Sequence, residues 1–215
     1  MKCSLIVAAS LVVGLGFTQA GQADVVIGDF EGGVAETGWG QWLSNSVQPF
    51  QDISVSNEAA TSGSYSAKID RAGWAQTLAY SAGAAGTIAD FQANNTLEFD
   101  VIFPATAQSG WAELFQLVLN SQHGGFTQVQ GVSQVGWGDG GGGAQTLSFA
   151  VDYSAIRQTW IDNGSPGWVE LIFAFNDDGN HPVKHVDNVR LTPEPASLAL
   201  LGLGGLALAA RRRGA

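Results

Sequence analysis

The sequence predicts an all-β domain in which two antiparallel sheets pack as a sandwich. Between Asp24 and Leu191 there is no long apolar pattern of period 3.6, whereas alternation of apolar and polar residues with period two is common. Glycine supplies 29 of the 215 residues, about twice its usual share, and seven Trp and eleven Phe accompany it. Many tight turns around an aromatic core are therefore expected, since two packed sheets are the economical way to bury such strands.

Two segments alternate most regularly. Residues 96–103 have one apolar face, with Glu98 and Asp100 on the other, and residues 168–175 repeat the pattern. Shorter strands are predicted at 25–30, 65–71, 112–119, 126–135, 145–151 and 183–191. Turn-rich segments separate them at 61–64, 139–143 and 176–180. The only short helix predicted within the domain spans 153–162.

The N-terminus is typical of a secretory signal peptide, which we place at residues 1–23. Lys2 precedes an apolar run over residues 5–17, and small residues follow, so that cleavage fits after Ala20 or Ala23. The alternative is an uncleaved signal helix, although the run is short for a bilayer span of about 20 residues. The only cysteine, Cys3, lies in this segment, so the mature domain is expected to contain no disulfide.

The tail at 192–215 has three parts in a fixed order. Pro193-Glu194-Pro195 comes first, an apolar run over residues 198–210 follows, and Arg211, Arg212 and Arg213 come last. This resembles the PEP-CTERM sorting tail. The resemblance implies an exosortase-type enzyme as partner, which cuts near the triplet once the hydrophobic helix has stopped in the membrane. The arginines would remain cytoplasmic as the membrane stop. The alternative is a permanent C-terminal anchor.

The charge of the exported stretch excludes one class of partner. Between Asp24 and Thr192 there are 18 acidic and five basic residues, a net charge near −13. Phosphate backbones require a dense field of Lys and Arg, so no nucleic acid partner is expected.

The domain at 24–191 carries a second resemblance. Residues 27–33 contain Phe-Glu, residues 60–68 contain Ser-Gly-Ser-Tyr-Ser, and residues 185–191 contain Val-Asp-Asn-Val. In this order they resemble the carbohydrate-binding modules with a galactose-binding-like jelly-roll fold. The resemblance implies polysaccharide as a partner. It also implies a structural Ca²⁺ where the first and last strands meet, held by Glu31, by backbone carbonyls of the turn from Ser62 to Ser64 and by Asp187, with Asp29 as an alternate ligand. The alternative is that Asp187 caps a strand end and Glu31 is solvated.

Catalytic patterns are not found in the sequence. Glycoside hydrolysis uses two carboxylates across a cleft, but Glu98 and Asp100 share one strand face, which we interpret as solvated. His181 and His185 flank Pro182 in a strand-like context that would separate them by about 13 Å, too far for a zinc pair. The glycine run at 139–143 lacks the Lys-Ser/Thr of a phosphate loop. We therefore predict a protein that is not an enzyme, with no catalytic residues and no organic cofactor.

Tryptophan side chains are the candidate ligand platforms. Sugar rings stack on Trp and need amide or carboxylate partners for their hydroxyls. Trp74, Trp111 and Trp137 lie beside polar or glycine-rich segments and are predicted to bind ligand. Trp39 and Trp42 flank Gly40 near the N-terminal strand, and most of the seven tryptophans are expected to fill the core.

These observations predict an exported, exosortase-sorted protein of the cell envelope or extracellular matrix. It would cross the inner membrane and be held transiently by its C-terminal helix. The domain would be a non-catalytic glycan-binding or structural β-sandwich. Two alternatives remain open: a glycan hydrolase or lyase on the same fold, and a structural surface protein without a small ligand.

Overall fold

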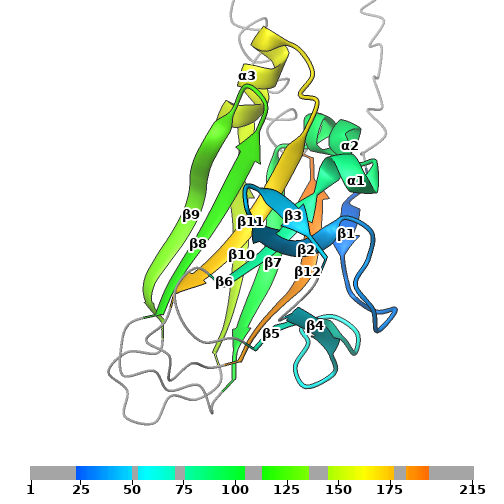
Figure 1. Ribbon diagram of the computed structural model, residues 1–215, viewed down its shortest axis with the longest axis vertical. Coiled ribbons are helices and arrows are strands. Elements are labelled where there is room, and N and C mark those ends of the chain that lie inside the picture. Colours follow the sequence, from blue (N-terminus) through cyan, green and yellow to red (C-terminus); the bar gives the residue numbers. More distant parts are fainter. Residues whose placement is uncertain are drawn as a thin grey trace, which may run out of the picture.

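The computed structural model describes residues 23–49, 53–70, 76–104, 113–135, 145–176 and 183–193, with the side chains of 113, 114 and 132–135 left aside (Figure 1). Within these residues the strands form two six-stranded sheets, and every pairing is antiparallel. The predicted antiparallel jelly-roll β-sandwich is therefore confirmed. The predicted signal helix and hydrophobic C-terminal helix lie outside the described residues.

Sheet A contains the last strand of the domain near its centre. Its order is β10 (Gln145–Asp152), β7 (Thr96–Phe103), β12 (Lys184–Thr192), β5 (Ser66–Ile69) and β4 (Ile53–Ser56), and β1 (Val25–Gly28) also pairs with β12. The first and last strands of the domain are thus hydrogen-bonded neighbours, as the sequence motifs implied.

Sheet B packs against sheet A across the core. Its order is β3 (Ser46–Gln48), β2 (Trp39–Leu43), β6 (Gln76–Ser81), β11 (Val169–Asn176), β8 (Glu113–Ser121) and β9 (Gly125–Val135). Consecutive segments of the chain pass repeatedly from one sheet to the other. Residues that form one face therefore come from distant parts of the sequence.

The core forms where the apolar faces of the alternating strands meet. Phe99 of β7 in sheet A packs against Phe173 of β11 at 5.1 Å and Phe115 of β8 at 5.9 Å between ring centroids, both in sheet B. All three rings are at most 1% exposed. Edge-to-face aromatic pairs of this kind add about 0.5–1.5 kcal/mol each to the burial of their area, so they join the two sheets firmly.

The described helices lie toward one end of the sandwich (Figure 1). The helix predicted at 153–162 is α3 (Ser154–Asn163), which lies at one end in Figure 1. Two short helices, α1 (Ala82–Ala85) and α2 (Ile88–Ala93), were not predicted. Within the described residues, no helix has the length and apolar character needed to cross a bilayer.

The sequence pattern also missed four strands, β2, β3, β4 and β6. Three of them have at most five residues, too few for a clear alternation. In β6, five consecutive residues are buried because both faces of the strand are covered. A strand that is covered on both sides has no polar face, so period-two alternation cannot reveal it.

Candidate functional site

The face of sheet B that points away from the core carries a small apolar cluster of its own. Ala79 of β6, Val118 of β8 and Ile172 of β11 are buried there, although they lie on the opposite side from the main core. Trp42 of β2 and Val47 of β3 pack over them. This outer face is therefore partly covered, and the indole of Trp42 is held against a rigid base.

An aromatic pair and a carboxylate stand beside this cluster. The rings of Trp42 and Phe126 lie 5.6 Å apart between centroids, and Phe126 is 60% exposed. Glu170 Oε2 accepts hydrogen bonds from Trp42 Nε1 at 3.3 Å and from Asn120 Nδ2 at 2.9 Å. Each of the four residues comes from a different strand of sheet B.

Strand register brings these residues together. Glu170 of β11 is directly opposite Asn120 of β8, which is directly opposite Phe126 of β9. In antiparallel sheets, side chains at directly opposed positions project to the same face about 4.5–5.5 Å apart at Cβ. The backbone ladder thus presets the spacing of the cluster, and Trp42 reaches it from β2.

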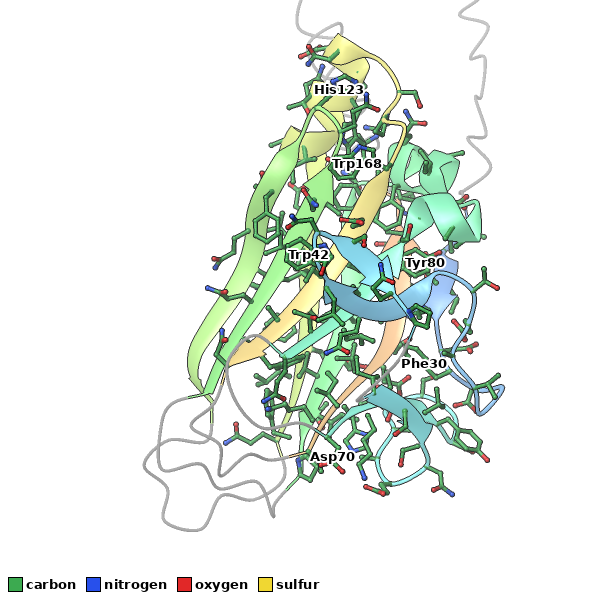
Figure 2. The ribbon with its side chains drawn as sticks, viewed as in Figure 1. Phe30, Trp42, Asp70, Tyr80, His123 and Trp168 are labelled. Atoms are coloured by element: carbon green, nitrogen blue, oxygen red, sulfur yellow. The ribbon has the colours of Figure 1, made fainter. Side chains whose placement is uncertain are left out.

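Trp168 extends the same row. It is 43% exposed and immediately precedes Val169, which is fully buried on the core side, so alternation places Trp168 on the side of Glu170. Its carbonyl accepts the N–H of Gln122 at 3.2 Å. In Figure 2, Trp168 lies between Trp42 and the turn with His123 along the long axis. We call Trp42, Asn120, Phe126, Trp168 and Glu170 the binding face.

The chemistry of the binding face suits a polar ligand with flat apolar surfaces. Aromatic rings can stack on the C–H faces of such a ligand, and the carboxylate and amide can exchange hydrogen bonds with its polar groups. No Lys or Arg occurs in any of the six strands of sheet B as the structure describes them. The only charges on these strands are acidic.

The outer face of sheet A carries a different arrangement, a loop held by carboxylates. The segment between β4 and β5 lies over β7 and β12. Asp187 Oδ2 accepts the N–H of Thr61 at 2.7 Å, the N–H of Ser62 at 2.9 Å and the hydroxyl of Thr61 at 3.1 Å. The same hydroxyl lies 2.6 Å from Oδ2 of Asp100. Burial raises the pKa of Asp187 above its usual value, and the hydrogen bonds from the loop oppose this.

Asp100 corrects the sequence interpretation of its strand face. It was expected to be solvated, but it is only 8% exposed because Thr61 and Asn188 lie against it. Glu98 is partly exposed and pairs with Arg190, with Nη2 to Oε2 at 2.6 Å. The solvated interpretation is therefore wrong for Asp100, since sequence alternation cannot show that a loop covers the outer face.

Glu31 holds the other half of the same loop. Its Oε1 accepts the N–H groups of Ser64 at 2.7 Å and Tyr65 at 2.8 Å. Gly63 lies between the two hydrogen-bonded pairs with φ of +63°, and a Cβ added there would contact the Glu31 carboxyl group. Asp29 Oδ1 accepts the N–H of Glu31 at 3.1 Å. The loop is thus bound at one end by Asp187 and at the other by Glu31.

These contacts bear on the predicted calcium ligands. The predicted set uses loop carbonyl oxygens at Ser62 and Ser64, but the loop turns its N–H groups toward Glu31 and Asp187. Among the residues that the structure describes, no three His, Cys, Asp or Glu side chains gather in a way that could hold a metal. The described hydrogen bonds do not match that ligand set, and calcium stays a prediction to be measured.

His185 lies on the same outer face under the loop. Its Nδ1 is 2.8 Å from Ser66 Oγ, and the residue is fully buried. Burial lowers the pKa of the imidazole below its usual value. His181, which the sequence spacing places too far from His185 for a zinc pair, lies outside the described residues.

Several predicted site residues lie outside the described part of the chain: Trp74, Trp111, Trp137, Glu194, Pro195, Arg211, Arg212 and Arg213. Their roles stay predictions. Of the described tryptophans, Trp39 and Trp160 belong to the core, as expected for most of them, whereas Trp42 and Trp168 reach the surface of sheet B. One signal for the binding face was present in the sequence: Glu170 is the acidic position on the outward side of the alternating strand at 168–175.

Comparison with known proteins supports two interpretations of the sequence: the PEP-CTERM sorting tail and the jelly-roll fold of carbohydrate-binding modules. Residues 191–213 match the family model described as the PEP-CTERM protein-sorting motif. No curated protein sequence gives a significant match.

Solved structures give many matches. The CBM27-1 module of Caldicellulosiruptor saccharolyticus, solved in complex with mannohexaose, is 21% identical with a TM-score of 0.58, covering 81% of this chain and 100% of the module. The K2 cleaved adhesin domain of Lys-gingipain is 13% identical with a TM-score of 0.51, covering 79% of this chain and 98% of that domain. At these identities the likeness establishes the fold. The chain is therefore a β-sandwich with the jelly-roll fold of carbohydrate-binding modules, and it carries a PEP-CTERM sorting motif at residues 191–213.

Proposed function

We propose that this protein is exported, sorted by an exosortase-type enzyme through its PEP-CTERM motif, and binds polysaccharide in the envelope or extracellular matrix without cleaving it. The observation that carries the glycan-binding proposal is the cluster of Trp42, Phe126 and Glu170 on the outer face of sheet B. The sorting motif supports export, and the fold is one that glycan-binding modules use.

The binding face is preorganised for a sugar chain. Glu170 accepts hydrogen bonds from Asn120 and from Trp42, so these polar side chains lose little conformational freedom when a ligand binds. Phe126, two strands away across the sheet, and Trp168, two residues before Glu170, are both exposed large side chains. An elongated chain could stack on successive rings while its hydroxyls contact the carboxylate and amide between them.

The rival enzymatic function requires two carboxylates on opposite sides of a cleft. Within the described residues, Glu98 is paired with Arg190, and Asp100 is covered by Thr61, so these two are committed to structural contacts. The arrangement favours binding over hydrolysis. Release of reducing sugar from any polysaccharide that the protein binds would revive the hydrolase or lyase.

A glycan array with the purified protein tests the proposal. Phe126→Ala should lower affinity for the bound glycan at least tenfold, about 1.4 kcal/mol, with little change in melting temperature because the ring is largely exposed. Val26→Ala, which removes a similarly exposed apolar side chain from β1 of sheet A, is the matched control. Binding that is unchanged in Phe126→Ala would refute this site.

The tryptophans predicted from sequence require their own comparison. Trp74→Ala, Trp111→Ala and Trp137→Ala should lose affinity with little change in melting if they are platforms. A core Trp would instead cost about 3–5 kcal/mol of stability. If all three variants melt early, the proposal that these tryptophans bind glycan fails. The binding face is tested separately by Phe126→Ala.

Sorting is tested by changing Pro193, Glu194 and Pro195 to alanine in a host that contains an exosortase. Export should continue, but the protein should accumulate in the membrane in a form that is larger by the tail. Processing equal to that of the parent would contradict the sorting proposal.

A further inference from the structure

We propose that the binding face selects glycans with free amino groups, such as polymers of deacetylated hexosamine. This inference rests on the proposed glycan-binding function and names the ligand class of the same site. It follows from the charge of the face and from the position of its one carboxylate among aromatic rings.

Among the residues that the structure describes, none of opposite charge forms an ion pair with Glu170. Its Oε2 accepts two neutral donors, Trp42 Nε1 and Asn120 Nδ2. The basic residues that the structure describes are Lys68, Lys184 and Arg190 in sheet A, and Arg157 in α3. A partly buried carboxylate with only neutral partners gains most from a ligand that brings a cation.

The aromatic rings add a second attraction for the same group. The faces of Trp and Phe carry negative electrostatic potential and attract an ammonium within about 6 Å of the ring centroid. The ring centroids of Trp42 and Phe126 are 5.6 Å apart, and Glu170 Oε2 lies 3.3 Å from Trp42 Nε1, so the carboxylate adjoins the aromatic pair. Trp168, two positions before Glu170 on the same face, provides a third ring.

A neutral glycan could use the stacking surfaces, but it would leave the charge of Glu170 unmatched. An acidic glycan would be repelled by Glu170 and by the net charge near −13 between Asp24 and Thr192. An aminated sugar can stack its C–H faces on the aromatic rings, and its ammonium group can pair with the carboxylate of Glu170. Charge complementarity therefore favours the aminated class over the other two.

The experiment compares two probes with the same backbone. Chitosan hexamer has free amines and chitin hexamer has the amines acetylated, so they differ only at the group that the proposal concerns. With the full chain purified in mild detergent, at a pH that keeps the amines charged, we expect chitosan hexamer to bind at least tenfold more tightly. Added salt should weaken chitosan binding more than chitin binding.

Two variants separate a specific contact from general attraction to an acidic protein. Glu170→Gln keeps the shape of the side chain and an acceptor oxygen, and it should lower chitosan affinity at least tenfold while chitin affinity changes less than about twofold. Asp24→Asn removes the same charge at an exposed position beside β1 in sheet A and should leave both affinities nearly unchanged. If Glu170→Gln melts early, the preference of the parent for chitosan hexamer over chitin hexamer, and the loss of that preference in added salt, decide the proposal.

The outcomes are distinguishable. Equal or tighter binding of the acetylated hexamer overturns this inference but leaves glycan binding in place. An equal loss of chitosan affinity in Glu170→Gln and Asp24→Asn also overturns it, since the attraction would then be nonspecific. If neither hexamer nor any neutral polysaccharide binds, the proposed function fails and this inference fails with it.

Discussion

Thr61 and Asp187 are 126 positions apart in sequence, yet Asp187 Oδ2 accepts both the N–H of Thr61 at 2.7 Å and its hydroxyl at 3.1 Å. Through this contact the last strand of the domain holds the loop between β4 and β5. The hydroxyl also reaches Asp100 on β7, so one side chain links the loop to two neighbouring strands of sheet A. The last strand is therefore joined to the rest of sheet A by this loop contact as well as by its backbone pairing with neighbouring strands.

The hydroxyl of Thr61 should stabilise the folded protein through this loop contact. Thr61→Val keeps the shape and the backbone N–H but leaves two largely buried carboxylates without their shared donor, so we expect a loss of about 1–3 kcal/mol in the free energy of unfolding. Thr61→Ser keeps the hydroxyl and should lose less than about 1 kcal/mol. Chemical denaturation measures both. A larger loss in Thr61→Ser than in Thr61→Val would show that the methyl group, rather than the hydroxyl, stabilises the loop.

Gly63 should be less tolerant of substitution than a glycine with similar backbone angles. Gly63→Ala introduces a left-handed alanine and also brings its Cβ against the Glu31 carboxyl group. Gly86 has φ of +77° and nothing within 4 Å of an added Cβ, so Gly86→Ala measures the backbone strain alone. We expect about 1 kcal/mol of destabilisation for Gly86→Ala and at least twice that for Gly63→Ala. Thermal melting of both variants checks the difference.

Glu36 should make the stability of the protein depend on pH. Burial, followed by a hydrogen bond with Asp29, raises the pKa of Glu36 to about 7 from 4.5. Because the folded state holds the proton more tightly, this contribution is fully present below about pH 4.5 and is lost as the pH rises through about 7. Glu36 is partly exposed, so we expect only about 1 kcal/mol after solvent screening, or about 2–4 °C in melting temperature.

Glu36→Gln is the variant that tests this dependence. The amide keeps an oxygen that can accept the N–H of Phe30, a contact that measures 2.9 Å with Glu36 Oε1. The melting temperature of the variant should fall less than that of the parent between pH 5 and pH 8, by about 2–4 °C. Parallel pH profiles for the two proteins would rule out Glu36 as the titrating group.

Calcium remains to be measured directly. The prediction from sequence is that calcium raises the melting temperature, that a chelator lowers it, and that Asp187→Ala abolishes the shift. The hydrogen bonds from the loop N–H groups to Glu31 and Asp187 provide an alternative way to hold the same loop. Identical melting with calcium and with chelator, in the parent and in Asp187→Ala, would remove the calcium site.

The sequence alone determined the fold class and most of the long strands. Alternation predicted β7 at 96–103, as observed, and β11 to within one residue at each end. In a strand with one buried face every second residue is apolar, and this pattern can be read from the sequence alone. The PEP-CTERM motif was readable for a similar reason: its order of residues is contiguous, and the match at 191–213 needs no tertiary contact.

Tertiary structure decided which residues share a surface. Trp39 and Trp42 are three positions apart, yet Trp39 is 6% exposed in the core while Trp42 lies on the outer face against Glu170, 128 positions away. Asp100 has the same local pattern as a solvated strand residue but is covered by a loop from elsewhere in the chain. Sheet order, register and loop placement are nonlocal, so they determine the partners of an outward-facing side chain that its neighbours in sequence cannot reveal.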